Sequence, residues 1–95
     1  MTMESVCVVL PAYNERGALG QLVPRILETL DATGVQPSVC VVDDGSTDGT
    51  FEWLLELQES DERIQILQLS RNFGQQAALL AGLRNVSADA VVMMD

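Results

Sequence analysis

Four short apolar runs recur along the chain and set its predicted secondary structure. They are Val6–Leu10, Val39–Val42, Ile64–Leu69 and Ala90–Met94. The first two are continuous and rich in valine, which is typical of strands buried on both faces of a parallel sheet. The third is interrupted by glutamines, which favours a position nearer the sheet edge. We expect the fourth to be another buried strand.

The segments between these runs predict helices. The first segment places apolar residues three and four positions apart, at Leu19, Leu22, Val23, Ile26, Leu27 and Leu30. Because proline is unfavourable inside a helix, we expect the regular helix to begin near Gly20, with Pro24 in its first turn, or to kink at Pro24. Helices are also predicted over residues 50–58 and 75–85, and small residues in the last would allow it to pack closely on the sheet. This β-α-β-α-β-α-β order predicts an α/β fold with right-handed crossovers.

The second run leads into the most informative segment, Asp43–Thr50, which reads Asp-Asp-Gly-Ser-Thr-Asp-Gly-Thr. In open α/β sheets, ligands bind outside the carboxyl ends of the strands, where this acidic pair falls. We expect Asp44 to face a ligand, whereas Asp43 either caps the turn or faces the ligand. Gly45 permits a sharp turn and close approach by a ligand. Asp48 is the expected N-cap of the next helix.

Polar residues after the other runs should reach the same edge. Tyr13 offers an aromatic face to a nucleobase, and carboxylates there can accept a ring N–H or a ribose hydroxyl. Asn14 and Glu15 either cap the next helix or face the ligand, and Arg71 either anchors its loop or contacts the ligand. A strand order of 3-2-1-4 would place Asp95 beside the Tyr13 loop. A rim carboxylate could also hold Mg²⁺ or Mn²⁺ against a diphosphate.

Composition narrows the function classes. The chain has 95 residues, 47% of them hydrophobic, and a formal net charge of −9, which suits one small globular domain. Such an acidic chain disfavours nucleic acid and anionic lipid as partners, and an anionic substrate would need a divalent cation between the two. Cys7 and Cys40 fall in predicted strands and are expected to be core residues, and the absence of histidine disfavours zinc. No segment looks like a signal peptide or a membrane span.

Several motifs in order resemble the start of a family 2 glycosyltransferase. They are Val8–Glu15, Val41–Thr50 and Asp95, and Arg71–Leu79 is similar to the polyprenyl-phosphate hexosyltransferases that act on dolichol or undecaprenyl phosphate. The resemblance extends from Ser5 onward. It implies an A-type glycosyltransferase fold, of which this chain is the Rossmann-like nucleotide-binding half. That half is a mostly parallel sheet of four strands in order 3-2-1-4 with flanking helices.

The resemblance also implies a UDP- or GDP-sugar donor, a polyprenyl-phosphate acceptor, and Mg²⁺ or Mn²⁺ as cofactor. It places Asp95 as the first aspartate of the family's Asp-x-Asp metal motif. Together with Asn14, the residues assigned to the nucleotide are Pro11, Tyr13, Glu15, Asp43, Asp44, Arg71 and Gly74. The parent enzyme would transfer a hexose at the cytoplasmic face of the membrane. We expect residues 1–95 to be one soluble N-terminal subdomain of a longer protein, with no catalytic residue of its own.

Two alternatives remain open. The chain could be a non-catalytic nucleotide-binding module of the same fold, or a truncated fold whose acidic edge has no function. In the second case, Asp43 and Asp44 would turn to backbone hydrogen bonds and away from the crevice. We also hypothesise that the unpaired edge of the fourth strand allows the chain to form a homo-oligomer. A monomeric mass measured by light scattering would contradict this hypothesis.

Overall fold

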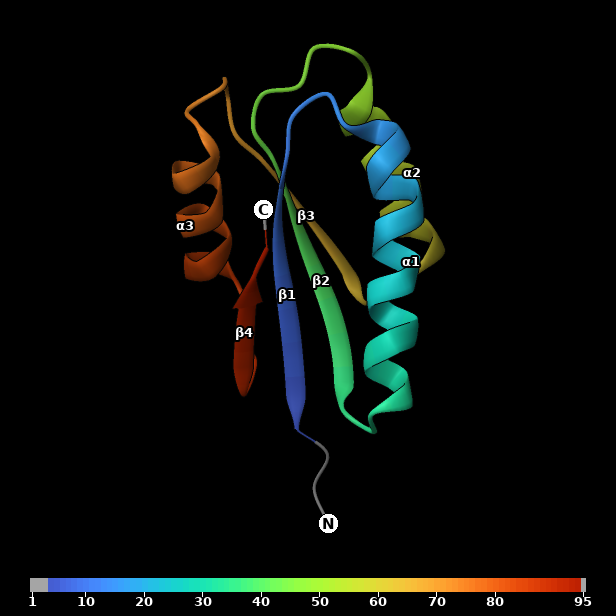
Figure 1. Cartoon of the computed structure of the whole chain (residues 1–95). Helices are drawn as coiled ribbons and strands as arrows, with labels where there is room; N and C mark the ends of the chain where they lie inside the picture. The colour runs from blue at the N-terminus through green and yellow to red at the C-terminus, as the bar shows by residue number, and fades with distance from the viewer. Residues whose placement is uncertain (1–3, 95) are drawn as a thin grey trace.

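The computed structural model describes residues 4–94 as a four-stranded sheet with helices on both faces (Figure 1). Its elements are β1 Ser5–Ala12, α1 Arg16–Ala32, β2 Gln36–Asp43, α2 Thr50–Ser60, β3 Ile64–Gln68, α3 Gln75–Asn85 and β4 Ala90–Met93. All neighbouring strands are parallel, in the order β3-β2-β1-β4. The α/β class, the strand order and the edge position of β3 are therefore confirmed.

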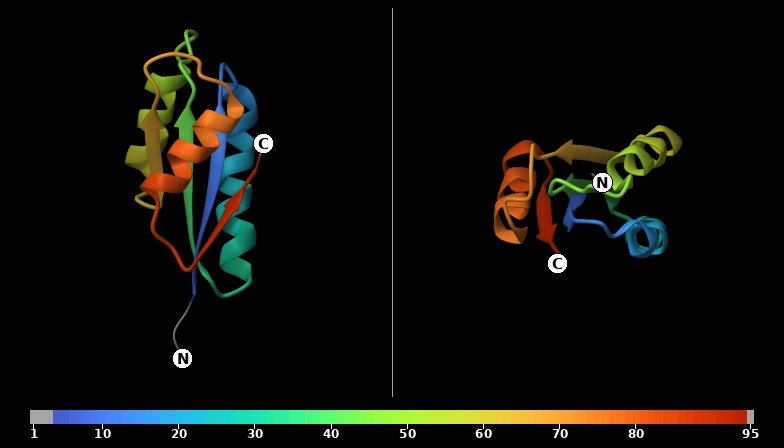
Figure 2. Two further views of the ribbon diagram at one scale, coloured as in Figure 1. Left: turned by 90° about the vertical axis from the view of Figure 1, so that its left-hand side faces the viewer. Right: turned by 90° about the horizontal axis from the view of Figure 1, so that it is seen from above.

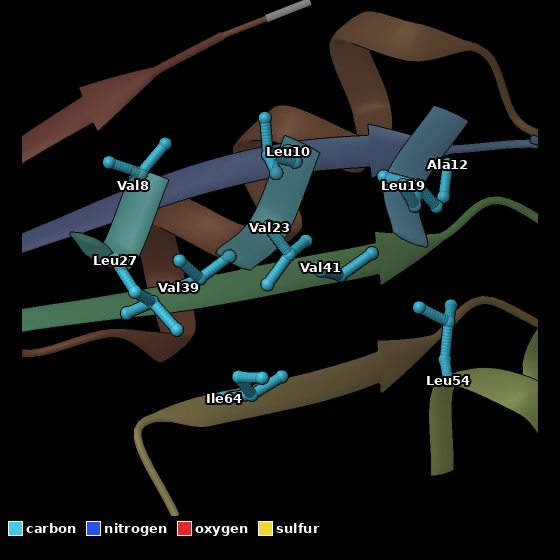
Figure 3. Close-up of a cluster of buried hydrophobic side chains, with 10 residues drawn as sticks. All are labelled: Val8, Leu10, Ala12, Leu19, Val23, Leu27, Val39, Val41, Leu54 and Ile64. Atoms are coloured by element: carbon cyan, nitrogen blue, oxygen red, sulfur yellow. The ribbon is translucent and has the colours of Figure 1, made fainter. Parts of the chain in front are cut away.

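The sheet separates two hydrophobic layers. Helices α1 and α2 cover one face and α3 covers the other (Figures 1 and 2). Because side chains alternate along a strand, Val39 and Val41 of β2 belong to the layer beneath α1 and α2, while Cys40 and Val42 belong to the layer beneath α3. Figure 3 shows the larger layer, where α1 contributes Leu19, Val23 and Leu27.

Helix α3 lies very close to the sheet, as its small residues predict. A Cβ at Gly82 would clash with Val9 and would lie 3.0 Å from Cγ2 of Val42, so glycine is required at this contact. Both cysteines are free and buried in this layer. Burial raises the pKa of the Cys40 thiol to about 12. The expectation that both cysteines are core residues is confirmed.

Helix α1 differs from its prediction. It begins at Arg16, four residues earlier than Gly20, and continues through Pro24 to Ala32. Proline removes one helical hydrogen bond, but Leu19 and Leu27 are buried on either side of it. Burial of this continuous apolar face outweighs the local cost of the proline. Of the two alternatives, the start near Gly20 was wrong, and the helix passes through Pro24.

Two strands extend further than their apolar runs. β1 continues through Pro11 to Ala12, and β2 begins at Gln36 and includes Pro37, which pairs in register with Val6. Proline lacks an N–H, but it is tolerated near the start of a strand and where its nitrogen is not needed for the ladder. The last residues of β1 and β2, Ala12 and Asp43, pair in register, so the loops after the two strands begin at the same height.

Strand β4 was predicted to be buried and is not. Val92 and Met93 are 46% and 52% exposed. The reason is that β4 pairs only with β1 in the described residues, and a groove of about 490 Å³ separates it from α1. The hypothesis of self-association rests on this free edge and stays a prediction. Within residues 4–94, no helix is long and apolar enough to span a bilayer.

Candidate functional site

A cavity of about 350 Å³ opens at the carboxyl edge of the sheet, the upper end in Figure 1. The loops after β1 and β3 form its walls, with the end of β2 between them. Its lining residues are Pro11, Ala12, Tyr13, Glu15, Asp44, Asn72, Gly74 and Gln75. Five of the residues predicted to surround a nucleotide therefore lie together around one cavity.

Asp44 is the central residue of this cavity and is only 4% exposed. One carboxylate oxygen accepts the N–H of Phe73 at 2.8 Å, and the other accepts the N–H of Gly74 at 3.0 Å. Its own N–H donates to the carbonyl of Ala12 at 2.8 Å. Asp44 thus joins the ends of β1 and β2 to the loop before α3. Each carboxylate oxygen has a second lone pair, so Asp44 can still accept a donor from a ligand in the cavity.

Asp43 lies on the opposite face of β2 and is fully buried. Its Oδ1 accepts the N–H of Ser46 at 3.3 Å, which closes the turn after the strand. Its Oδ2 is buried and has no hydrogen-bond partner among the described residues. Asp43 does not line the cavity. Of the two roles left open for it, the structure shows the capping of the turn.

Gly45 allows two loops to pack against each other. Its φ of +78° confirms the sharp turn. A Cβ at this position would clash with the carbonyl carbon of Arg71 and would lie 2.5 Å from the nitrogen of Asn72. The close approach predicted for a ligand at Gly45 is therefore made by the backbone of the loop after β3.

Asn14 connects the loop after β1 to the loop after β2. Its N–H donates to Oγ of Ser46 at 2.9 Å, and its Oδ1 accepts the N–H of Thr47 at 3.0 Å. Its φ of +54° is left-handed, a conformation that asparagine tolerates better than most residues. Glu15 occupies the N-cap position of α1 without a side-chain capping bond and lines the cavity instead. Asn14 makes no cap bond to α1 and does not line the cavity.

Two further residues from the predictions, Arg71 and Asp48, are not among the residues that line the cavity. The guanidinium of Arg71 stacks over the ring of Phe73, 4.7 Å from its centroid, so both residues face solvent as a pair. Asp48 accepts hydrogen bonds from the N–H and the hydroxyl of Thr50, so it satisfies the start of α2 from one position before the N-cap, Gly49. The hydroxyl of Thr50 lowers the pKa of Asp48. Asp95, assigned to a metal, lies outside the described residues.

Sequence reasoning missed three lining residues, Ala12, Asn72 and Gln75. The side-chain amides of Asn72 and Gln75 can both donate and accept hydrogen bonds. Asn72 lies in the loop after β3 and Gln75 is the first residue of α3, so the rule that places ligands at the carboxyl ends of strands applies to them as well.

The side chains around this cavity differ from those of a metal site. Among residues 4–94, no group of three or more His, Cys, Asp or Glu side chains converges in a way that would hold a metal ion. The cavity instead combines one aromatic face, two carboxylates and two amides in a half-open hollow. This arrangement suits a flat, hydrogen-bonding ligand such as a nucleoside.

A parallel sheet in the order 3-2-1-4, with helices on both faces and a cavity at the carboxyl ends of its strands, is the Rossmann-like arrangement expected for half of an A-type glycosyltransferase fold. The sequence profile of glycosyl transferase family 2 matches residues 7–95, and the chain belongs to that family.

Curated relatives are longer than this chain. The undecaprenyl-phosphate 4-deoxy-4-formamido-L-arabinose transferase of Edwardsiella ictaluri is 38% identical over 95 residues, which are 99% of this chain and 29% of the relative. The protein of the same name from Salmonella paratyphi B is 36% identical over 94 residues, 98% of this chain and 29% of the relative. The chain therefore spans less than a third of the length of these relatives.

Solved structures agree on the fold. A mannosyltransferase from Pyrobaculum calidifontis, in complex with GDP-Man and Mn²⁺, superposes with a TM-score of 0.68 and 27% identity over 96% of this chain and 27% of that chain. TarS from S. aureus superposes with a TM-score of 0.69 and 24% identity, over the same shares of the two chains, and supports the fold alone.

Proposed function

We propose that this chain is the donor-binding part of a glycosyltransferase that transfers a sugar from UDP or GDP to a polyprenyl phosphate at the cytoplasmic face of a membrane. The observation that carries the proposal is the cavity around Asp44, at the strand edge where this fold binds nucleotides. The acceptor is supported by the names of the curated relatives, which are undecaprenyl-phosphate transferases. The donor class is supported by GDP-Man in the Pyrobaculum structure.

Five of the lining residues have a defined role in this proposal. Asp44 accepts an N–H of the base through its free lone pairs, while its two existing hydrogen bonds keep its carboxylate in place. Tyr13, which is 41% exposed, packs its ring on the face of the base. Glu15 and Gln75 are available to the ribose hydroxyls. Gly74 has a φ of +101° and no side chain, which leaves room beside the base.

A divalent metal is the second part of the proposal. A chain of net charge −9 repels an anionic diphosphate unless a cation lies between them. Mn²⁺ in the Pyrobaculum structure supports this requirement. The proposal assigns the metal to Asp95, which matches the first aspartate of the family's Asp-x-Asp motif. When bound, the cation would offset negative charge on the nucleoside diphosphate.

Calorimetric titration with UDP and GDP, with and without Mn²⁺, tests the proposal. We expect one of the two nucleotides to bind, more tightly with Mn²⁺, and Tyr13→Ala and Asp44→Ala to weaken binding by about tenfold or more. Tyr13→Ala provides the test if Asp44→Ala fails to fold. Asp31→Ala, at the opposite edge, is the matched control and should bind like wild type. Absence of binding by wild type, or equal binding by Tyr13→Ala and wild type, would contradict the proposal.

A further inference from the structure

The loop that supplies Tyr13 and Glu15 to the cavity is held from behind. Among the residues that the structure describes, two side-chain hydrogen bonds join this loop to the loop after β2, and both involve Asn14. They run in opposite directions: Asn14 donates its N–H to Ser46 Oγ at 2.9 Å, and its Oδ1 accepts the N–H of Thr47 at 3.0 Å. We call this pair of bonds the Asn14 clasp.

The clasp is itself anchored to the buried end of β2. Ser46, which receives the N–H of Asn14, donates its own N–H to Oδ1 of the fully buried Asp43 at 3.3 Å. Three hydrogen bonds, one from Ser46 to Asp43 and the two of the clasp, therefore connect the core to the loop after β1. On the other face of β2, Asp44 holds the loop after β3 through Phe73 and Gly74. The side chain of Asp43 thus supports the wall formed by the loop after β1, and the side chain of Asp44 supports the wall formed by the loop after β3.

Asparagine meets both local requirements of the clasp. A left-handed φ of +54° is unfavourable for most residues and is adopted most readily by glycine, asparagine and aspartate. Of these three, glycine has no side-chain oxygen to accept the N–H of Thr47. The side chain of Asn14 does not line the cavity, although those of its neighbours Tyr13 and Glu15 do.

We infer that Asn14 is a positioning residue, which sets the affinity for the nucleotide by fixing the Tyr13–Glu15 loop and does not contact the nucleotide. The inference rests on the proposed function for its ligand, and on the two clasp bonds for its mechanism. Pre-organising a binding loop improves affinity because less conformational entropy is lost when the ligand binds.

Three substitutions separate the two requirements. Asn14→Gly keeps the left-handed backbone and removes the acceptor, and we expect nucleotide affinity to fall by about threefold to tenfold, the worth of one hydrogen bond. Asn14→Ala removes both features and should bind more weakly still. Asn14→Asp keeps both features and should stay within about threefold of wild type. Thr47→Ala is the matched control, because the N–H of Thr47 takes part in the clasp and its exposed side chain does not.

A spectroscopic readout in the free protein distinguishes positioning from contact. Tyr13 is the single tyrosine and Trp53 the single tryptophan of the chain, so the NMR signals of each ring are assigned directly. Trp53 lies in α2 and packs against the core cluster on the α1 and α2 face of the sheet. In Asn14→Gly without nucleotide, we expect the Tyr13 ring signals to shift or broaden while the Trp53 indole signal stays unchanged.

The outcomes separate the inference from the function on which it rests. Affinity lost in Asn14→Gly with unchanged Tyr13 signals would mean direct contact with the nucleotide and would overturn the inference. Wild-type affinity in Asn14→Gly would overturn it as well, as would a change at Trp53 equal to that at Tyr13. If wild type binds no nucleotide, the proposed function fails, and the Tyr13 signals still report whether the clasp holds the loop. Altered Tyr13 signals, weaker binding by Asn14→Gly and near-wild-type binding by Asn14→Asp support it.

Discussion

The carboxyl and amino edges of the sheet carry hollows of nearly equal size, about 350 and 340 Å³, and both hollows are lined in part by acidic residues. At the amino edge, the guanidinium of Arg63 binds Asp31 at 2.9 Å and Asp61 at 2.7 Å. At the carboxyl edge, Asp44 is bound only by backbone N–H groups. Asp31 and Asp61 are therefore paired with a cationic side chain, whereas Asp44 has no salt bridge among the described residues.

This difference shows why a hollow with carboxylates is not by itself a ligand site. Arg63 places its guanidinium between the two nearby carboxylates, so their negative charge is offset and the pair attracts a cationic ligand less strongly. The loops differ too. Within residues 4–94, four of the five residues with positive φ, including Asn14 and Gly45, lie in the carboxyl-edge loops, and Gly34 lies at the amino edge. The carboxyl edge is built from backbone shapes that need particular residue types, which is common at functional sites.

The largest expected effect comes from placing a methyl group in the carboxyl-edge loops. Gly45→Ala introduces a clash with the backbone of Arg71 and Asn72 at a left-handed φ, and we expect it to lower the free energy of unfolding by about 2–4 kcal/mol. Gly34→Ala has the same type of φ but meets no atom within 4 Å, so it should cost about 1 kcal/mol. Urea unfolding of the two variants measures the difference. Equal costs would mean that the two edges are equally tolerant.

An intermediate effect should come from removing one acid at each edge. Asp44→Ala leaves two N–H groups of the loop before α3 without their acceptor, and we expect a loss of about 1–3 kcal/mol. Asp31→Ala removes one exposed partner of Arg63, and surface ion pairs of this kind contribute about 0–1 kcal/mol. Chemical unfolding provides both values. A larger loss for Asp31→Ala than for Asp44→Ala would reverse the comparison.

The smallest effect should be a difference in how the two edges respond to acid and salt. Hydrogen bonds from Arg63 lower the pKa of Asp61, and the hydroxyl of Thr50 lowers the pKa of Asp48. A carboxyl group with a lower pKa in the folded state stabilises the protein above its unfolded pKa, near 4, and that stability is lost as pH falls through the folded pKa. Acid should therefore weaken both edges.

Salt separates the two contributions. About 1 M sodium chloride should reduce the acid sensitivity that Arg63 provides, because it screens an exposed ion pair, and should leave that of Thr50 largely unchanged. Unfolding from neutral to acidic pH, in low and high salt, tests this with Arg63→Gln and Thr50→Val. Each variant should lose its own share of the acid sensitivity, and an equal salt response of the two variants would contradict the expectation.

The sequence predicts what depends on local patterns. Valine runs identify β1 and β2 as buried strands, and the Asp-Asp-Gly turn after β2 marks the edge where the cavity lies. The start of α1 could not be predicted from the local cost of Pro24, because burial of Leu19 and Leu27 decides it. The exposure of β4 was equally hidden, since its apolar run reads the same whether or not another element covers it.

The hydrogen bonds of the site are the least predictable part. Asn14 and Thr47 are 33 positions apart, and Asp44 and Gly74 are 30 positions apart. Sequence reasoning placed these residues at the same edge of the sheet, because parallel strands bring their carboxyl ends together. Whether Asn14 turns to a ligand or to another loop depends on side-chain geometry that only the folded chain defines.

The burial of Cys7 and Cys40 has a practical consequence for measuring these loops. Maleimides react with the thiolate form of cysteine. The buried thiol of Cys40 has a pKa of about 12, so it forms almost no thiolate at neutral pH. A single cysteine introduced on the exposed surface can therefore carry a fluorophore in the native background. The distance from Trp53, the natural donor of the chain, to a wall of the cavity then becomes accessible to energy transfer.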